Sequence, residues 1–114
     1  MPTFEEILER AKSLGLPMAE YQFEKTSRSS VPDPPFLIYM SEEEQYGSDF
    51  KALLRRIDGT LELYTDRKPD PDLEKRVEEE VLYDIDCTKA QIKINSENMV
   101  QTTYEFEIIQ KKGK

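Results

Sequence analysis

The sequence predicts an α+β domain built on a mainly antiparallel sheet, with two helices packed on one face. Apolar residues recur at helical spacing in two separate segments, around residues 4–14 and 71–82. The segments between and after them alternate apolar and polar residues, as strands do. The resulting order is α-β-β-β-α-β-β, and runs of strands without intervening helices favour antiparallel pairing. We expect one domain over residues 1–110, followed by a frayed basic tail at 111–114.

The first helix begins with a capping box. Thr3 can accept a hydrogen bond from a free backbone N–H, and Glu6 can reach back to the start of the helix. Gly15 and Pro17 then end it. The apolar residues between these signals predict an amphipathic helix that packs on the sheet: Phe4, Ile7, Leu8, Ala11 and Leu14.

Two strands and two connections follow. Alternation of apolar and acidic or amide residues over positions 19–24 predicts a half-buried strand. Residues 25–35 contain three prolines and three serines, which predicts a loop. Residues 36–40 form a short apolar run typical of a central strand. Residues 41–49, SEEEQYGSD, are predicted to connect this strand to the next one, antiparallel to it.

The remaining strands show clearer alternation. The pattern over residues 50–64 predicts one long strand. Within it, Asp58-Gly59 is interpreted as a bulge rather than as a hairpin turn. Ile92 and Ile94 begin a further strand, and residues 96–98 form a turn. The last strand carries apolar residues or threonine at every second position from Val100 to Ile108.

The second helix begins at Asp70-Pro71. Aspartate is a favoured N-cap residue, and proline is favoured at the first helical position. Asp72 and Glu74 fall in the first turn, where the helix dipole favours negative charge. The helix hides a narrow apolar stripe: Leu73, Val77, Val81 and Leu82.

The composition restricts the partners. The net charge is −8, from 24 acids and 16 bases, so the surface repels phosphate and sequence-specific nucleic-acid binding is not expected. DNA is compatible with this chain only as a passing cargo. No apolar run approaches the ~18 residues of a membrane span, so no membrane partner is predicted. The single cysteine, Cys87, excludes an intrachain disulfide and fits a cytosolic setting.

Neither catalysis nor metal binding is predicted. The chain has no histidine, which removes the commonest general base and transition-metal ligand. The segment that starts at Asp66 does not match a calcium-binding EF-hand loop. Such a loop needs an oxygen ligand at position 3 and glycine at position 6, where this chain has Lys68 and Pro71. Two Asp-x-Asp pairs, Asp70/Asp72 and Asp84/Asp86, have the spacing of pairs that can hold a divalent metal ion. Such pairs also occur often by chance in so acidic a chain.

The same residues argue against a nuclease and against a cysteine nucleophile. A magnesium-dependent nuclease would combine Asp70, after Pro69, with Lys93 on a strand, but the second acid is missing. Cys87 has no histidine to activate it, so we expect a buried or neutral thiol. The sequence therefore predicts a protein that is not an enzyme and holds no cofactor.

Four segments together resemble a known family. They are TFEEILERAKSLGLPMAEYQFE from Thr3, PPFLIY from Pro34, ELYTDRKPDPDLEKRVEEEV from Glu62 and YEFEI from Tyr104. With the order of elements, they resemble small tail-completion proteins of long-tailed phages and prophages of Gram-positive bacteria. These are similar to tail terminators, also called tail-to-head joining proteins.

The resemblance implies a homo-oligomeric ring, expected to be a hexamer, that caps the finished tail tube and docks the head. Its partners would be further copies of itself, the tail tube protein and the head-connector protein. It would act in the bacterial cytoplasm during assembly and then in the virion tail. The acidic residues Glu42, Glu43, Glu44 and Asp49 are candidates for contacts with a partner or for the lumen wall, with a solvated hairpin loop as the alternative.

A second hypothesis comes from a different class of protein. The chain could be a free-standing acidic module that binds or regulates a protein partner as a monomer or dimer. An isologous dimer through the last strand, residues 100–108, would suit this hypothesis if that strand lies at a sheet edge.

Overall fold

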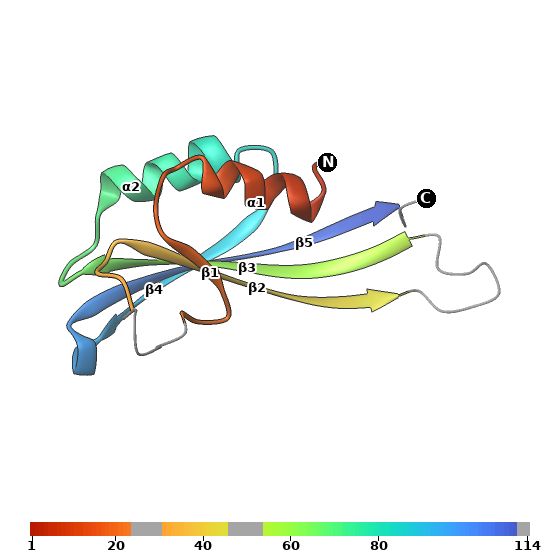
Figure 1. Cartoon of the computed structure of the whole chain (residues 1–114). Coiled ribbons are helices and arrows are strands. Elements are labelled where there is room, and N and C mark those ends of the chain that lie inside the picture. Colours follow the sequence, from red (N-terminus) through yellow and green to blue (C-terminus); the bar gives the residue numbers. More distant parts are fainter. Residues whose placement is uncertain (24–30, 46–53, 112–114) are drawn as a thin grey trace.

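Two helices cover one face of a five-stranded sheet and leave the other face without a helix (Figure 1). The computed structural model describes residues 1–23, 31–45 and 54–111. Helix α1 spans Phe4–Lys12, and α2 spans Pro71–Arg76 and continues as the π-helical turn η1, Val77–Val81. The strands are β1 (Met18–Glu20), β2 (Phe36–Gln45), β3 (Leu54–Asp66), β4 (Cys87–Ile94) and β5 (Met99–Lys111), with the short 3-10 helix η2 (Asn95–Glu97) before β5. The α+β class, the two helices on one face and the order of elements are confirmed.

The strands lie in the order β1-β2-β3-β5-β4. β1 runs parallel to β2, and the other neighbours pair antiparallel. β5 therefore lies inside the sheet, paired with β3 on one side and β4 on the other. The expectation that residues 100–108 form a sheet edge is wrong, because the strand before β5 folds back along it and takes the edge position.

β3 is one long strand, as predicted, but it has no bulge at Asp58-Gly59. Its register with β2 and β5 advances one residue at a time through both positions. The glycine serves packing instead. A Cβ atom on Gly59 would lie 2.6 Å from Cε2 of Phe106 and 3.0 Å from Cε1 of Phe4, so only a residue without a side chain leaves room for these rings.

The acidic segment predicted as a loop is largely strand. β2 extends to Gln45 and pairs with β3 as far as Arg55. Cross-strand ion pairs stabilise this extension, because Glu43 contacts Arg55 at 2.7 Å and Glu44 contacts Arg56 at 3.3 Å. Asp49 lies outside the described residues, as do the last three residues of the predicted basic tail, whose first residue still belongs to β5.

β1 is shorter than the predicted strand at 19–24. Tyr21 adopts a positive φ of 66°, which ends the extended conformation after Glu20. Phe23 then packs against Phe36 at a ring-centroid distance of 5.3 Å, and Phe36 stacks on Tyr64 at 4.9 Å. The chain after β1 thereby covers one end of the helix-free face.

Both predicted helix caps are present. Thr3 and Glu6 form a reciprocal capping box, with N–H···O distances of 2.9 and 3.1 Å. Asp70 accepts a hydrogen bond from the Leu73 amide at 3.1 Å, and Pro71 occupies the first helical position. Between the helices and the sheet lies the core, whose most buried members include Ile7, Ala11, Val77, Val81, Leu61, Leu63, Tyr104 and Ile108.

Candidate functional site

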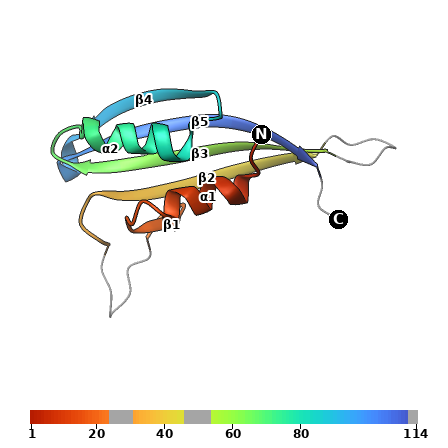
Figure 2. The same ribbon diagram turned by 90° about the horizontal axis from the view of Figure 1, so that it is seen from above.

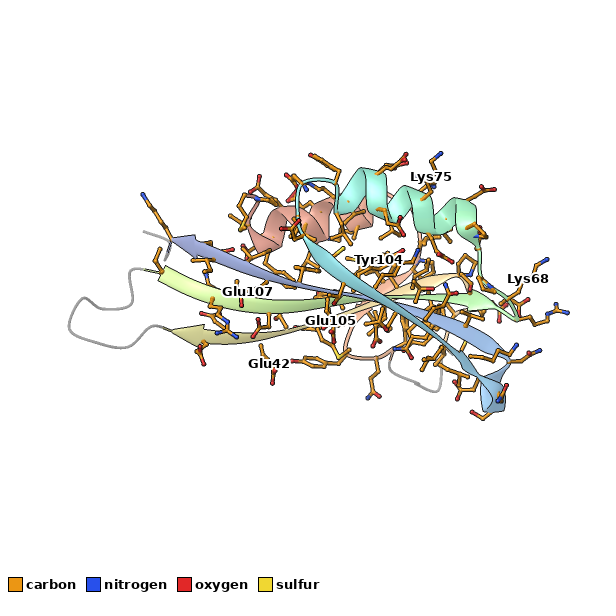
Figure 3. All side chains as sticks on the ribbon, turned by 180° about the vertical axis from the view of Figure 1, so that it is seen from behind. Glu42, Lys68, Lys75, Tyr104, Glu105 and Glu107 are labelled. Carbon is orange, nitrogen blue, oxygen red and sulfur yellow. The ribbon has the colours of Figure 1, made fainter. Side chains whose placement is uncertain are left out.

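The helix-free face of the sheet, called here the open face, is the polar side of the molecule's central strands. Successive side chains on a strand point to opposite faces. On β3, Ile57, Leu61 and Leu63 join the core, so Asp58, Thr60 and Glu62 point to the open face. In Figure 3, Tyr104 lies between the sheet and the helices, whereas Glu42 lies on the opposite side of the sheet.

Strand pairing brings three carboxylates to one level of the open face. Asp58 on β3 is directly opposite Glu42 on β2 and Glu107 on β5. Side chains directly opposite each other across antiparallel strands have Cβ atoms about 5 Å apart, and like charges at that spacing destabilise the sheet. Glu105 lies two residues before Glu107 on β5 (Figure 3), and it pairs with Thr60 of β3. This acidic row is therefore an arrangement that folding alone does not favour.

One guanidinium partly neutralises the row. Arg56 lies 3.3 Å from Asp58, 3.3 Å from Glu44 and 3.0 Å, through Nε, from Glu107. The contact through Nε is an ion pair without the alignment of a hydrogen bond. Asp58 first, and Glu107 and Glu44 further, raise the pKa of Arg56 above its ordinary value, so it stays charged. A single Arg56 leaves the acids around it with a net negative charge.

A shallow hollow lies over this part of the open face. Its volume is about 710 Å³, and a second hollow of about 420 Å³ adjoins it. Met40, Thr60, Thr88 and Tyr21 contribute to the lining of the larger hollow. Its acidic lining residues come from β2, β3, β5 and the segment just before β4, and they are Glu42, Asp58, Asp86, Glu105 and Glu107. We call these five acids and Glu44 the acidic face.

The neighbouring part of the open face is polar but satisfied by its own hydrogen bonds. Glu62, only 9% exposed, accepts from the Tyr64 hydroxyl at 2.9 Å and from Nε2 of Gln101 at 2.9 Å. Nε2 of Gln101 also donates to Thr103 at 3.0 Å. Burial, and then the Glu62 carboxylate, raise the pKa of Tyr64. This network links β3 to β5 across the open face.

The structure divides the acids that were predicted to act together. Glu42 and Glu44 belong to the acidic face, whereas Glu43 points to the helix side and binds Arg55 through both carboxylate oxygens, at 2.7 and 2.8 Å. The acids contributed by β3 and β5 were missed. Their alternation was visible in the sequence, but only strand pairing shows that they meet Glu42.

A second polar cluster joins α2 and η1 to β4 on the helix side. Lys89 lies 2.8 Å from Glu74 and 2.7 Å from Glu78. Glu78 also accepts from the Tyr104 hydroxyl at 2.8 Å, and Gln91 donates to Glu74 at 2.9 Å. The hydrogen bond from Lys89 holds the pKa of Glu78 below its ordinary value, and Glu74 and Glu78 raise that of Lys89. This cluster fastens β4 to the helices.

The residues considered for chemistry have structural partners. Asp70 caps α2, and Nζ of Lys93 donates to the Arg67 carbonyl at 2.6 Å and to Asn98 at 3.0 Å. Cys87 is an exposed residue, so the expectation of a buried thiol is wrong. Partial loss of solvent around the thiol, and then Glu78 and Asp86, raise its pKa, which favours the neutral form. Within residues 1–23, 31–45 and 54–111, histidine, cysteine and acidic side chains form no group of three or more that could hold a metal ion.

Comparisons with models of known protein families and with curated protein sequences give no match. None of the helices in the described ranges is long and apolar enough to cross a membrane.

Proposed function

We propose that this chain is a tail terminator or tail-to-head joining protein that forms a closed ring, expected to be a hexamer. The ring caps the finished tail tube and docks the head, in the bacterial cytoplasm during assembly and in the virion tail afterwards. The proposal rests on the sequence resemblance and on one structural observation, which is the acidic face on the uncovered side of the sheet.

The acidic face suits the wall of a DNA passage. Glu42, Asp58 and Glu107 lie side by side at one level, although like charges opposite one another weaken a sheet. A wall of this charge repels phosphate, so DNA slides past it without adhering. The open face would then line the lumen and the helices would face outward, since they cover the other side of the sheet (Figure 1).

A ring also explains how one small chain serves two different partners. Copies related by a head-to-tail contact that closes produce a ring with two unlike ends. One end would bind the tail tube protein and the other the head-connector protein. Each contact is repeated around the ring, so weak contacts of a single copy add up to firm capping.

Charge reversal on the two sides of the sheet tests this function. In one variant, Glu42→Lys and Glu105→Lys place four charge units of change on the acidic face. In the matched control, Glu9→Lys and Glu79→Lys make the same change on exposed helix positions. Both variants should fold and cap tails of normal length, seen by electron microscopy. Only the acidic-face variant should slow DNA delivery, because positive charge in the lumen binds the DNA phosphates.

Two results would contradict the proposal. Normal DNA delivery by virions shown to contain the acidic-face variant would contradict the proposal that the acidic face lines the DNA passage. Tails of normal length with heads attached in a strain lacking the protein altogether would remove the terminator function.

One structural observation supports the alternative hypothesis of a free-standing acidic binding module. β4, not β5, is the edge strand, and its side chains are exposed at every position except Ile94. A regulatory dimer would therefore form through β4. Native mass spectrometry over a concentration series distinguishes the two, because a dimer that never proceeds to larger species favours the regulatory module.

A further inference from the structure

The sheet has two outer strands, β1 and β4, and no strand of the described chain lies beyond either one. Figure 2 shows them at opposite edges of the sheet. An edge strand presents backbone N–H and C=O groups that pair readily with another strand. Whether the two edges fit each other can be worked out from the pairing inside the sheet.

The outward groups of β1 follow from its contacts with β2. The Leu37 amide donates to the Pro17 carbonyl at 2.8 Å, and the Tyr21 amide donates to the Tyr39 carbonyl at 2.9 Å. In a parallel ladder, a residue that bonds toward its neighbour lies opposite one that points away. Leu37 is opposite Met18, and Tyr39 is opposite Glu20. The N–H and C=O groups of Met18 and Glu20 therefore point outward, and the Glu20 carbonyl also accepts from the Gln22 amide at 2.7 Å.

The same alternation, carried across the sheet, gives the outward groups of β4. Leu37 and Tyr39 bond toward β1, so their level partners on β3, Leu63 and Leu61, bond toward β5. Their partners on β5 bond back toward β3 rather than toward β4. On β4, the residues at these two levels are Gln91 and Lys89, whose backbone groups consequently point outward.

The two edges match in level, face and direction. Lys89 lies at the level of Glu20, and Gln91 lies at the level of Met18. At both levels the side chains are on the helix side of the sheet. β4 runs opposite to β1, because one parallel and three antiparallel pairings separate them. Rotation about an axis along the strands preserves these directions, so β4 of one copy would meet β1 of the next antiparallel.

We propose that neighbouring copies join by adding β1 of one copy to β4 of the next, with Lys89 opposite Glu20, Ala90 opposite Ala19 and Gln91 opposite Met18. The pairing satisfies outward backbone groups on both edges and places unlike charges opposite each other. It forms one continuous wall with the acidic face on a single side. Closure of that wall rests on the ring proposed above.

Disulfide trapping tests this register. Ala19→Cys and Ala90→Cys are introduced together in a Cys87→Ser background. Within one copy the two positions are separated by four strand spacings, roughly 19 Å, which a disulfide cannot bridge. Between copies they form a pair without mutual hydrogen bonds, with Cα atoms about 4.5 Å apart. Mild oxidation should therefore give a ladder of cross-linked multimers that ends at the ring size.

Two control variants test whether cross-linking depends on the proposed pairing of β4 with β1. Pairing Ala19→Cys with Thr88→Cys moves one thiol by two residues on the same face, about 6.7 Å, and should lower the cross-linked yield by at least about tenfold. Ala90→Cys alone should stay uncross-linked. A covalent dimer from Ala90→Cys alone would show that β4 pairs with itself and would overturn the proposed contact.

The remaining outcomes separate this contact from the proposed function. A ring in native mass spectrometry of the reduced protein, without cross-links on oxidation, overturns the contact and leaves the function standing. A cross-linked ladder from a protein that fails to cap tail tubes supports the contact and removes the function. Neither ring nor cross-link at the highest soluble concentration overturns both.

Discussion

Gly59 offers a sharp test of how the sheet packs against the helices. A Cβ atom at this position would lie 2.6 Å from Cε2 and 2.8 Å from Cζ of Phe106, whereas ordinary contacts begin at 3.4 Å. In Gly59→Ala, the Phe106 ring must therefore move by roughly 0.8 Å. That ring is 7% exposed and lies 6.2 Å from the Phe4 ring, so it has little room.

Two opposing effects decide the magnitude. Replacing glycine by alanine inside a strand gains about 0.5–1 kcal/mol of backbone entropy. Overpacking a buried site costs about 1–3 kcal/mol. Because the clash involves two buried rings rather than a flexible side-chain end, we expect Gly59→Ala to lose about 1–2 kcal/mol of unfolding free energy, which lowers Tm by at least about 4 °C.

Urea unfolding followed by far-UV circular dichroism measures this loss, with the slope m unchanged and the midpoint lowered. The control is Phe106→Leu, which removes the two atoms that clash. In that background Gly59→Ala should cost less, and the difference is the coupling of the two positions. A Gly59→Ala protein as stable as the parent, or an equal penalty with Phe106→Leu, would refute the packing argument.

Three further predictions concern single carboxylates. Asp70→Ala should cost about 1 kcal/mol in urea unfolding and Asp70→Asn little, with no rise in Tm on adding Mg²⁺ or Ca²⁺; a metal-dependent gain lost in both variants would contradict the cap. The pKa of Glu78 is lowered from 4.5, so its pair with Lys89 stabilises the fold above that pH and is lost as the pH falls through the lowered pKa. Glu78→Gln should therefore flatten the fall in unfolding free energy below about pH 4.5, and an unchanged acid profile would count against the pair. Glu43→Lys should destabilise the protein by about 1 kcal/mol through loss of the Arg55 pair, whereas Glu42→Lys should stay within about 0.5 kcal/mol; equal losses would show that the two residues share an environment.

Local signals in the sequence determined the helices and their starts. The capping box at Thr3 and the Asp70-Pro71 start were predictable, because each depends on hydrogen bonds and φ angles within a few residues. Alternation also assigned the two faces of β3 and β5, since a strand turns successive side chains to opposite sides wherever it is placed.

The errors in the prediction arose where distant segments meet. Residues 42–44 resemble an acidic loop, and only their pairing with Arg55 and Arg56 makes them strand. Asp58-Gly59 resembles a bulge, and only the packing of Phe106 explains the glycine. Neither feature has a local signature, because Glu43 and its partner Arg55 are 12 residues apart and Phe106 lies on a different strand from Gly59.

The sequence by itself thus determined the fold class, the helix caps and the negative charge of the chain. The tertiary structure decided which strands are neighbours, and with it the candidate site. Glu42, Asp58 and Glu107 come from three segments of the chain and share one level only because β3 lies between β2 and β5. The same ladder placed β4 rather than β5 at the edge. Neighbours and register are set by hydrogen bonds and packing across the whole sheet, which no single stretch of sequence contains.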